Sequence, residues 1–373
     1  MKVKLANPDI TDKEIQAVVE VMKSGWLSIG PKIEEFEQKF KDYLGVKHAI
    51  GVNSGTSGLH CLVKSMGIGE GDQVITTPFS FVASTNCFMF EGAEPVFVDI
   101  DPKTFNINID AIEEKINEKT KAILPVDVFG QPQDMTKIKE IADKYNLKVI
   151  EDSCEALGAE YEEIKAGTVC DGAVFAFYPN KQITTGEGGM IVTNDDHIAD
   201  LCRSYRSQGR AITGFWLHHE RMGYNYRLSE INAVIGSLQM DRLDSILDQR
   251  KNVAKMYNQK FSNVKEVQIP YIDPKVTRMS WFVYVVQIEK GISRNNVMKY
   301  LKENGVACRP YFTPIHIQPY MKEKFGFKEN DYPITSDIGN RSIALPFFNK
   351  LTEKEIDYVV ETLKKAILNE KQG

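Results

Sequence analysis

The chain has 373 residues, a formal net charge of -5, 42% hydrophobic and 26% charged residues, a composition ordinary for a soluble globular protein. Because single cores stop growing at roughly 250 to 300 residues, this length predicts two domains. No basic block indicates a nucleic-acid partner, and no apolar run approaches the roughly 18 residues that span a bilayer. The start also lacks an apolar signal-peptide core, so we expect a cytoplasmic protein without a membrane partner.

The six cysteines are scattered along the chain and form no Cys-x-x-Cys pair. This scatter indicates reduced core thiols rather than a disulfide framework or a zinc site. His218 and His219 precede Glu220, but adjacent histidines do not share a helix face as i, i+4 ligands do. We therefore expect no metal.

Two helices are expected near the start of the chain. Thr11 and Glu14 form a capping-box pattern before apolar residues at helical spacing, and that spacing ends at Gly25. Pro31 begins a second helical pattern, which ends at Gly45. Both are predicted to be scaffold helices.

Between residue 46 and about residue 195, short apolar runs alternate with helical patterns. This alternation predicts an α/β fold with a mostly parallel sheet flanked by helices. Ligands of such sheets bind at the carboxyl ends of the strands. The predicted strands are 49–52, 73–76, 95–98, 122–126, 149–152, 173–177 and 190–193.

One stretch of this region, residues 175–190, carries a candidate reactive group. Its apolar run stops at Tyr178-Pro179, Lys181 follows, and glycines then lead into a second apolar run. The preceding predicted strand ends on Asp152, and buried aspartates are rare unless they pair with a cation. Lys181 and Asp152 are therefore predicted to meet at one edge of the sheet.

A third candidate lies at residues 53–58, where small hydroxyl residues and glycines separate a strand from a helical pattern. Free N–H groups and the helix dipole at such a place bind phosphate. An amine, an acid and a phosphate site together meet the needs of pyridoxal 5′-phosphate (PLP). Neither a Gly-x-Gly-x-x-Gly nor a Gly-Lys-Ser/Thr motif is present, which argues against dinucleotide or P-loop nucleotide binding.

The last third of the chain changes character and predicts a small α+β domain. We place the boundary at residue 248, with a large PLP-binding domain over 1–248 and a small C-terminal domain over 249–373. The elements expected around and beyond it are an irregular loop over 213–226, helices over 228–247 and on to about 261, a strand over 280–288, a helix over 295–304, a strand over 306–312 and a terminal helix over 353–367.

These motifs, in this order, resemble the sugar-nucleotide aminotransferases of the DegT/StrS group, which are fold-type-I PLP enzymes. The resemblance covers nearly the whole chain and implies a large domain with a seven-stranded, mostly parallel sheet and a small α+β domain. It rests on residues 53–57, 77–81, 151–153, 175–189, 223–227 and 309–312.

The resemblance assigns the catalytic roles by position. Lys181 would bind the cofactor aldehyde and later move a proton between the substrate carbon and the cofactor. Asp152 would keep the ring nitrogen protonated, although it could instead cap the following turn. Phe81 matches the aromatic residue that stacks on the cofactor ring, with core packing as the alternative.

Further residues would bind the cofactor. Thr56 and Ser57, with the Gly55 backbone, match the phosphate cradle, with an ordinary helix cap as the alternative. Asn225 matches an asparagine that reaches the phosphate of the neighbouring subunit, which implies a homodimer with shared active sites. Glu155 stands where relatives often have an amide or histidine near the phenolic oxygen, so a carboxylate there would have to be neutralised.

One position departs from the family pattern: Ala176 replaces a usual serine. The phosphate thereby loses a hydroxyl donor worth roughly 1 kcal/mol. Toward the substrates, Arg227 could meet the carboxylate of the amino donor or form a structural salt bridge. Candidates near the sugar are His218, His219, Tyr311 and His316.

The resemblance implies transfer of an amino group from L-glutamate to a nucleoside-diphosphate-linked keto-sugar. The run 309–319 favours a 4-keto-6-deoxyhexose carried on GDP or UDP. Alternatives are amination at C3 of a sugar or of an inosose, and a non-catalytic PLP-binding regulator. Related dehydratases carry histidine in place of the lysine, so Lys181 argues against them.

Overall fold

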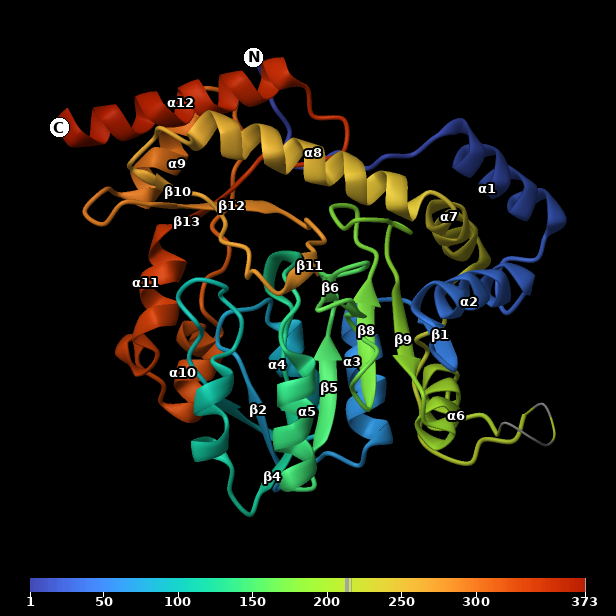
Figure 1. Ribbon diagram of the computed structural model, residues 1–373. Coiled ribbons are helices and arrows are strands. Elements are labelled where there is room, and N and C mark those ends of the chain that lie inside the picture. Colours follow the sequence, from blue (N-terminus) through green and yellow to red (C-terminus); the bar gives the residue numbers. More distant parts are fainter. Residues whose placement is uncertain (212–214, 216, 373) are drawn as a thin grey trace.

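The computed structural model describes residues 1–211, 215 and 217–372. Its centre is a seven-stranded sheet of order β1-β9-β8-β5-β4-β2-β3, in which β9 is antiparallel to both neighbours and the other pairs are parallel (Figure 1). All the strands predicted for this region are confirmed, and the sheet is mostly parallel as expected. They are β1 His48–Val52, β2 Gln73–Thr76, β3 Glu94–Phe97, β4 Thr120–Leu124, β5 Lys148–Asp152, β8 Gly172–Ala176 and β9 Gly189–Thr193.

Helices cover both faces of this sheet. Alternate residues of a strand point to opposite faces, and in β5 the side chain of Ile150 joins the core cluster that contains α3 (Gly55–Ser65), whereas Val149 joins the cluster of α5 (Met135–Lys144). Other helices around the sheet are α4 Ala83–Met89 and α6 Asp196–Arg206. Burial on both faces explains why the strands are almost wholly apolar.

The two predicted N-terminal helices are confirmed as α1 (Asp12–Ser24) and α2 (Pro31–Leu44). The Thr11 backbone N–H donates to the Glu14 carboxylate at 2.9 Å, which completes the capping box. Both helices end at glycines in the left-handed region, Gly25 with φ 72° and Gly45 with φ 74°. Helix α2 packs along α7 (Glu230–Met240) beside β1.

The helical pattern predicted from 228 to about 261 forms two helices, α7 and α8 (Leu243–Phe261), with the break at Asp241 and Arg242. The loop predicted over 213–226 lies partly outside the described residues. Helix α8 runs through the predicted domain boundary at residue 248, and Val253 already belongs to a second core. The boundary therefore stays a prediction.

The second core lies around a three-stranded sheet of order β10-β12-β13. Val3 also belongs to it and forms a bridge with Val306, so the start of the chain packs with the last third. The elements of this part are β10 Val267–Gln268, β12 Tyr284–Ile288, α9 Arg294–Glu303, α10 Pro319–Phe325, α11 Pro333–Arg341, β13 Ser342–Leu345 and α12 Glu353–Gln372, and a further small sheet joins β11 Val276–Arg278 to β6 Glu160–Tyr161 and β7 Ile164–Lys165.

Two strand predictions in this part were wrong in extent. The strand expected over 280–288 begins only at Tyr284, because the Ser280 N–H donates instead to the carbonyl of Gly130, after β4 of the large sheet (3.1 Å). The segment 306–312 makes only isolated bridges, and Pro310 has no N–H to offer a strand ladder. Both segments therefore run from the small sheet toward the large one.

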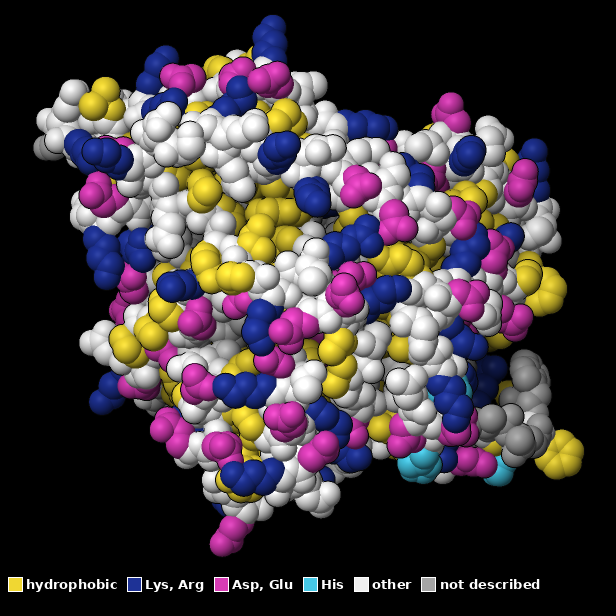
Figure 2. Space-filling model, in the orientation of Figure 1, with side chains coloured by type: hydrophobic (Ala, Val, Ile, Leu, Met, Phe, Trp, Pro, Cys, Tyr) yellow, Lys and Arg dark blue, Asp and Glu magenta, His cyan; other side chains and the backbone are white. Residues whose placement is uncertain are grey.

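The surface is mixed in charge. Figure 2 shows lysine and arginine side chains interspersed with acidic ones over the visible face. None of the helices in residues 1–211, 215 and 217–372 is long and apolar enough to cross a membrane.

Candidate active site

A cavity of about 640 Å³ lies at the carboxyl ends of β5 and β8 and is closed on one side by the segments that cross from the small sheet. Predicted site residues from well-separated parts of the chain share it: Gly55, Thr56, Phe81, Asp152, Glu155, Lys181 and Tyr311 all line its wall. The other lining residues are Ser54, Leu59, Ser80, Ala83, Val126, Cys154, Ala176, Tyr178, Asn180, Glu187, Gly188, Phe282, Pro310 and Phe312. The fold therefore brings the predicted amine and the predicted acid together.

Lys181 sits in the turn after β8, where its backbone N–H donates to the Tyr178 carbonyl at 2.9 Å. Its Nζ lies 3.6 Å from Oε1 of Glu155 and 3.9 Å from the centroid of the Phe282 ring. A carboxylate and an aromatic face both stabilise a positive charge. The amine is thus held at the cavity wall between a carboxylate and an aromatic ring.

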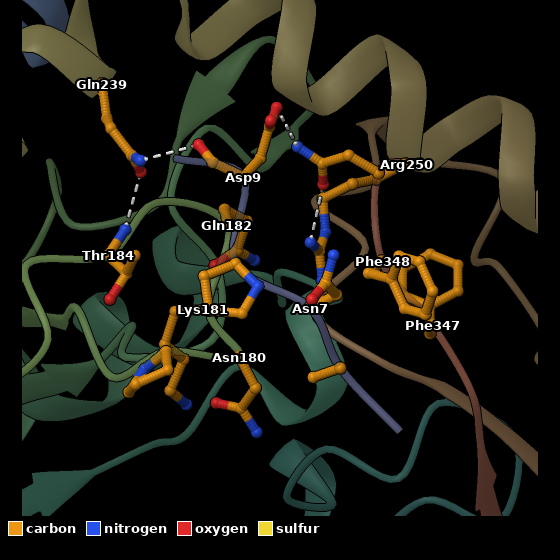
Figure 3. Close-up of a pocket in the computed structure, with 14 residues that line it drawn as sticks. Asn7, Asp9, Asn180, Lys181, Gln182, Thr184, Gln239, Arg250, Phe347 and Phe348 are labelled. Atoms are coloured by element: carbon orange, nitrogen blue, oxygen red, sulfur yellow. Dashed lines mark hydrogen bonds between the residues drawn. The ribbon is translucent and has the colours of Figure 1, made fainter. Parts of the chain in front are cut away.

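The far side of the Lys181 turn is packed against the start of the chain. A hollow of about 10 Å³ lies there, and Figure 3 shows Lys181, Asp9, Gln239 and Arg250 among the residues that line it. Gln239 accepts the Thr184 N–H at 2.8 Å and donates to the Asp9 carbonyl at 3.1 Å. These bonds fix the backbone that carries the lysine.

Arg250 of α8 fixes the segment that carries Phe282. Its buried guanidinium donates to the carbonyls of Trp281 at 2.5 Å and Phe282 at 2.6 Å. Burial lowers the pKa of Arg250 to about 9. Gln182, the residue after the lysine, donates to the Ser280 carbonyl at 2.9 Å. The ring of Phe282 is therefore held against the lysine by α8 on one side and by the lysine turn on the other.

Asp152 ends β5 in the cavity wall and is buried. Its Oδ1 accepts the Cys154 N–H at 3.2 Å, so the predicted turn cap is present as well. Burial raises the pKa of this carboxyl, opposed by the hydrogen bonds from Cys154 and by the charge of Lys181. A buried acid of this kind is stabilised by a cationic nitrogen placed against it.

Glu155 accepts the Phe129 N–H through Oε2 at 2.8 Å and faces Lys181 through Oε1. Burial raises its pKa, whereas the charge of Lys181 and the Phe129 hydrogen bond lower it. The sequence analysis expected that a carboxylate at position 155 would have to be neutralised. In this arrangement the positive charge of Lys181 lies beside it.

The N-terminus of α3 forms another wall of the cavity. A Cβ on Gly55 would lie 2.8 Å from Cβ of Ala176 and 2.9 Å from Sγ of Cys154, so only glycine fits this close approach of helix and sheet. Ser57 is buried and donates to Oδ1 of Asn53 at 2.6 Å, which matches the helix-cap alternative. Gly55 and Thr56 remain as the cradle for an anion.

These residues fit PLP. The helix N-terminus offers free N–H groups to a phosphate, Asp152 is a buried acid that a ring nitrogen would satisfy, and Lys181 is an amine in reach of the same space. Phe81 lies on the cavity wall with 62% of its surface exposed, which leaves its ring free to cover a ligand.

Tyr311 lies in the part of the cavity wall formed by the segment from the small sheet, and its ring stacks on that of Phe282 at 6.3 Å. Its hydroxyl accepts a hydrogen bond from Asn180 at 3.4 Å, and its ring stacks on Phe312 at 5.0 Å. Burial raises the pKa of Tyr311 to about 12, with the charge of Glu155 acting in the same direction. The hydroxyl is therefore a neutral hydrogen-bonding group at neutral pH.

The remaining predicted residues do not line this cavity. His316 is fully buried against the Glu329 carbonyl (3.3 Å), and His218 and His219 are exposed on the loop after α6. Arg227 donates to Oε1 of Gln208 at 2.7 Å, and burial and the charges of Arg210 and Arg206 lower its pKa. Within the described part of the chain Arg227 forms no ion pair, so its structural salt-bridge alternative is not found there.

Asn225 also lies outside the cavity of its own chain and is exposed. Sequence reasoning in turn missed Phe282, whose ring touches the lysine amine. No local pattern marks Phe282, because it reaches the site from a segment about 100 residues later that leaves the small sheet. Tyr178 and Asn180 border the lysine motif and could have been found by their position in it.

Comparison with known proteins gives the same picture across the whole chain. The chain is 40% identical over 372 residues to GDP-perosamine synthase from Caulobacter vibrioides, covering 98% of this chain and 99% of the relative. Two solved structures superpose over 99% of this chain. One is Helicobacter pylori PseC, an aminotransferase involved in the biosynthesis of pseudoaminic acid, covered over 100% of its length (TM-score 0.94, 28% identity). The other is the PLP-form of the putative sugar aminotransferase Spr1654 from Streptococcus pneumoniae, covered over 99% of its length (TM-score 0.93, 28% identity).

The family model for the DegT/DnrJ/EryC1/StrS aminotransferase family matches residues 8–364. The matched region includes Lys181, Asp152 and the N-terminus of α3, which the fold gathers around one cavity. The chain therefore belongs to the DegT/DnrJ/EryC1/StrS family and is a PLP-dependent aminotransferase.

Proposed function

We propose that this enzyme transfers the amino group of L-glutamate to a nucleoside-diphosphate-linked keto-sugar, giving an amino-deoxy sugar nucleotide. The observation that carries the proposal is the shared cavity, in which Lys181 lies between Glu155 and Phe282 and Asp152 forms part of the wall. The curated relative above is named for a GDP-linked amino sugar. A 4-keto-6-deoxyhexose is our preferred acceptor.

Each site residue has a separate role in the proposed reaction. Bound PLP supplies an electron sink for the bond changes at the substrate carbon. Lys181 takes the proton from the α-carbon of the amino donor and later returns one to the sugar carbon that receives nitrogen. Asp152 keeps a proton on the ring nitrogen, and the α3 N-terminus with Thr56 binds the phosphate. Phe81 covers one face of the ring.

The size and wall of the cavity support a substrate larger than an amino acid. About 640 Å³ is within the usual range of ligand sites, and Tyr311 offers a neutral hydroxyl on the side formed by the segment from the small sheet. We place the sugar along this side. Arg227 remains our candidate for an anionic group of a substrate bound to a second copy, since no carboxylate of the described residues pairs with it.

We propose a homodimer with shared active sites, in which Asn225 reaches the phosphate region of the other subunit. The exposure of Asn225 supports this arrangement. Size-exclusion chromatography with light scattering measures the mass, and a mixture of Lys181→Ala and Asn225→Ala chains tests the sharing. Mixed dimers should regain one intact site and hence part of the activity; no recovery would contradict shared sites.

The reaction itself is tested with purified enzyme, PLP, L-glutamate and a panel of keto-sugar nucleotides. We expect 2-oxoglutarate and an amino sugar nucleotide in equal amounts, detected by mass spectrometry. Formation of 2-oxoglutarate with glutamate alone, but no product from any keto-sugar, would refute the acceptor and leave the donor standing. The 3-keto-sugar and inosose alternatives are compared in the same panel.

A further inference from the structure

The side chain of Asn225 is directed out of its own chain by a firmly held backbone. Its neighbours bond on both sides: Tyr226 N–H donates to the Arg206 carbonyl at 2.9 Å, and Asn53 N–H donates to the Tyr226 carbonyl at 2.8 Å. Asn225 itself pairs with Ser207 in an antiparallel bridge. Its side chain is exposed, and no residue in the described part of the chain hydrogen-bonds its amide.

The two tyrosines on either side of Asn225 point inward. Alternate residues of an extended segment face opposite sides, so Tyr224 and Tyr226 share the face that Asn225 does not. Their rings stack with centroids 4.9 Å apart and planes inclined by 9°. Whatever holds these two rings therefore also fixes the direction of the asparagine.

A cluster of a buried histidine and two half-buried charged side chains holds them. Oε1 of Glu91, just after α4, accepts the Tyr224 hydroxyl at 2.9 Å and lies 2.8 Å from Nε2 of His60, while its Oε2 accepts from Lys64 at 2.6 Å. Nδ1 of His60 lies 3.1 Å from the Tyr226 hydroxyl. We call His60, Lys64 and Glu91 the anchor cluster. The hydroxyl of each tyrosine lies within hydrogen-bonding distance of one member of this cluster.

Two of the three members of the anchor cluster lie on the same helix as the phosphate cradle. His60 and Lys64 follow Thr56 at intervals of one helical turn in α3, and His60 is buried. The His60 ring lies 4.8 Å from the Tyr224 ring and 5.3 Å from the ring of Phe90. One helix thus carries the cradle at its N-terminus and two members of the anchor cluster, His60 and Lys64, along its length.

We propose that the anchor cluster is a positioning device for Asn225: Glu91, through Tyr224 and Tyr226, holds the asparagine amide in the direction from which it reaches the cofactor phosphate of a second copy of this chain. The inference rests on the shared-site dimer of the proposed function. It makes Glu91 and His60 contributors to cofactor binding in a site that they do not touch.

The test measures the dissociation constant of pyridoxamine phosphate, which carries the same phosphate but forms no bond to Lys181. Asn225→Ala should weaken binding about tenfold, the effect of one hydrogen bond to a charged group. Glu91→Ala should weaken it roughly three- to tenfold. In the double variant, affinity should equal that of Asn225→Ala alone, because the anchor acts only through the asparagine.

Glu35→Ala is the matched control, since Glu35 is another acid with hydrogen bonds to lysine and serine side chains but lies on α2. It should leave the affinity unchanged. Glu91→Gln keeps the shape and the neutral hydrogen bonds, so it should weaken binding less than Glu91→Ala and serves if that variant does not fold. Light scattering should report the same oligomer for all variants.

Two outcomes overturn the inference separately from the proposed function. If Asn225→Ala weakens binding and the Glu91 effect is additive to it, or absent, the anchor cluster is structural only. If Asn225→Ala itself leaves affinity unchanged, the shared site fails and the inference fails with it, although aminotransfer within one chain would still stand.

Discussion

The active-site cavity and the anchor cluster are both built from charged side chains around α3, yet their contacts differ. In the anchor cluster, Glu91 accepts three hydrogen bonds of 2.6 to 2.9 Å. Burial alone would raise its pKa, but the hydrogen bonds from Lys64, His60 and Tyr224 lower it to about 2. In the cavity, Glu155 is 3.6 Å from its lysine, and burial raises the pKa of Glu155 and Asp152.

This difference distinguishes a carboxylate that stabilises the fold, Glu91, from carboxylates placed to interact with a ligand, Glu155 and Asp152. A carboxylate with a full set of donors is stable as an ion and fixes its neighbours. An acid with a raised pKa, beside a loosely paired amine, is stabilised only when a ligand brings the missing charge. The comparison predicts opposite responses of stability and activity to substitution in the two places.

The largest effect is expected at the reactive amine. Lys181→Ala should lower the rate of aminotransfer by at least about a thousandfold, because both the cofactor bond and the proton carrier are lost. The assay is steady-state formation of 2-oxoglutarate. Lys148→Ala, at the opposite end of β5, removes a half-exposed lysine paired with Asp171 and should retain activity. Comparable activity of the two variants would contradict the assignment of Lys181.

Asp152→Asn should separate activity from stability. Activity should fall roughly a hundredfold or more, since an amide does not hold the ring nitrogen protonated. Because the folded-state pKa of Asp152 is raised above its ordinary 3.8, the ionised acid costs stability once pH rises through that range. The cofactor-free variant should therefore be at least as stable as the parent at pH 7 in urea denaturation. If Asp152→Asn lost stability but kept its activity, Asp152 would be a structural residue, which would contradict the account.

The anchor cluster should show the opposite pH dependence. The pKa of Glu91 is lowered from 4.5 to about 2, so its contribution is present above about pH 4.5 and is lost as pH falls toward 2. We expect Glu91→Gln to be less stable than the parent by about 2 to 3 kcal/mol near neutral pH. Urea denaturation should show this gap closing below about pH 4.5. A constant gap between about pH 6 and pH 3.5 would contradict the charge-based account.

The smallest effect is expected for Phe282→Leu. Loss of the aromatic face over the lysine should lower kcat about three- to tenfold, in keeping with the strength of a buried cation–π contact. Phe312→Leu is the control, because Phe312 lines the same cavity but packs on Phe79 and Phe129 rather than on the lysine. Equal losses in the two variants would assign the effect to packing.

The sheet and its strand ends could be predicted from the sequence because both depend on local patterns. Apolar runs of four or five residues fixed the strands, and parallel pairing then brought Asp152 and the Lys181 turn to one edge. The strand expected over 306–312 was a wrong prediction. Its residues make only isolated bridges, and Pro310, which has no N–H to donate, is the local signal that the apolar pattern outweighed in the prediction.

Within the site, the residues that could not be predicted from the sequence are those that come from distant segments of the chain. Asp152 and Lys181 follow neighbouring strands, whereas Phe282 is placed by Arg250 and by contacts between segments far apart in the sequence. His316 shows that closeness in sequence is not enough either. It lies only four residues after the 309–312 motif, yet the short helix Ile315–Ile317 places its ring in the protein interior, away from the cavity. Ser57 was predicted beside Thr56, but the helix cap uses its hydroxyl.

The most direct test of the central claim is the near-visible absorption spectrum of the PLP-loaded enzyme, followed through two additions. L-glutamate should convert the spectrum to that of the aminated cofactor and release 2-oxoglutarate in equal amount. A nucleoside-diphosphate-linked 4-keto-6-deoxyhexose should then restore the starting spectrum. A spectrum that glutamate leaves unchanged would contradict the proposed donor, and one that no keto-sugar restores would contradict the proposed acceptor.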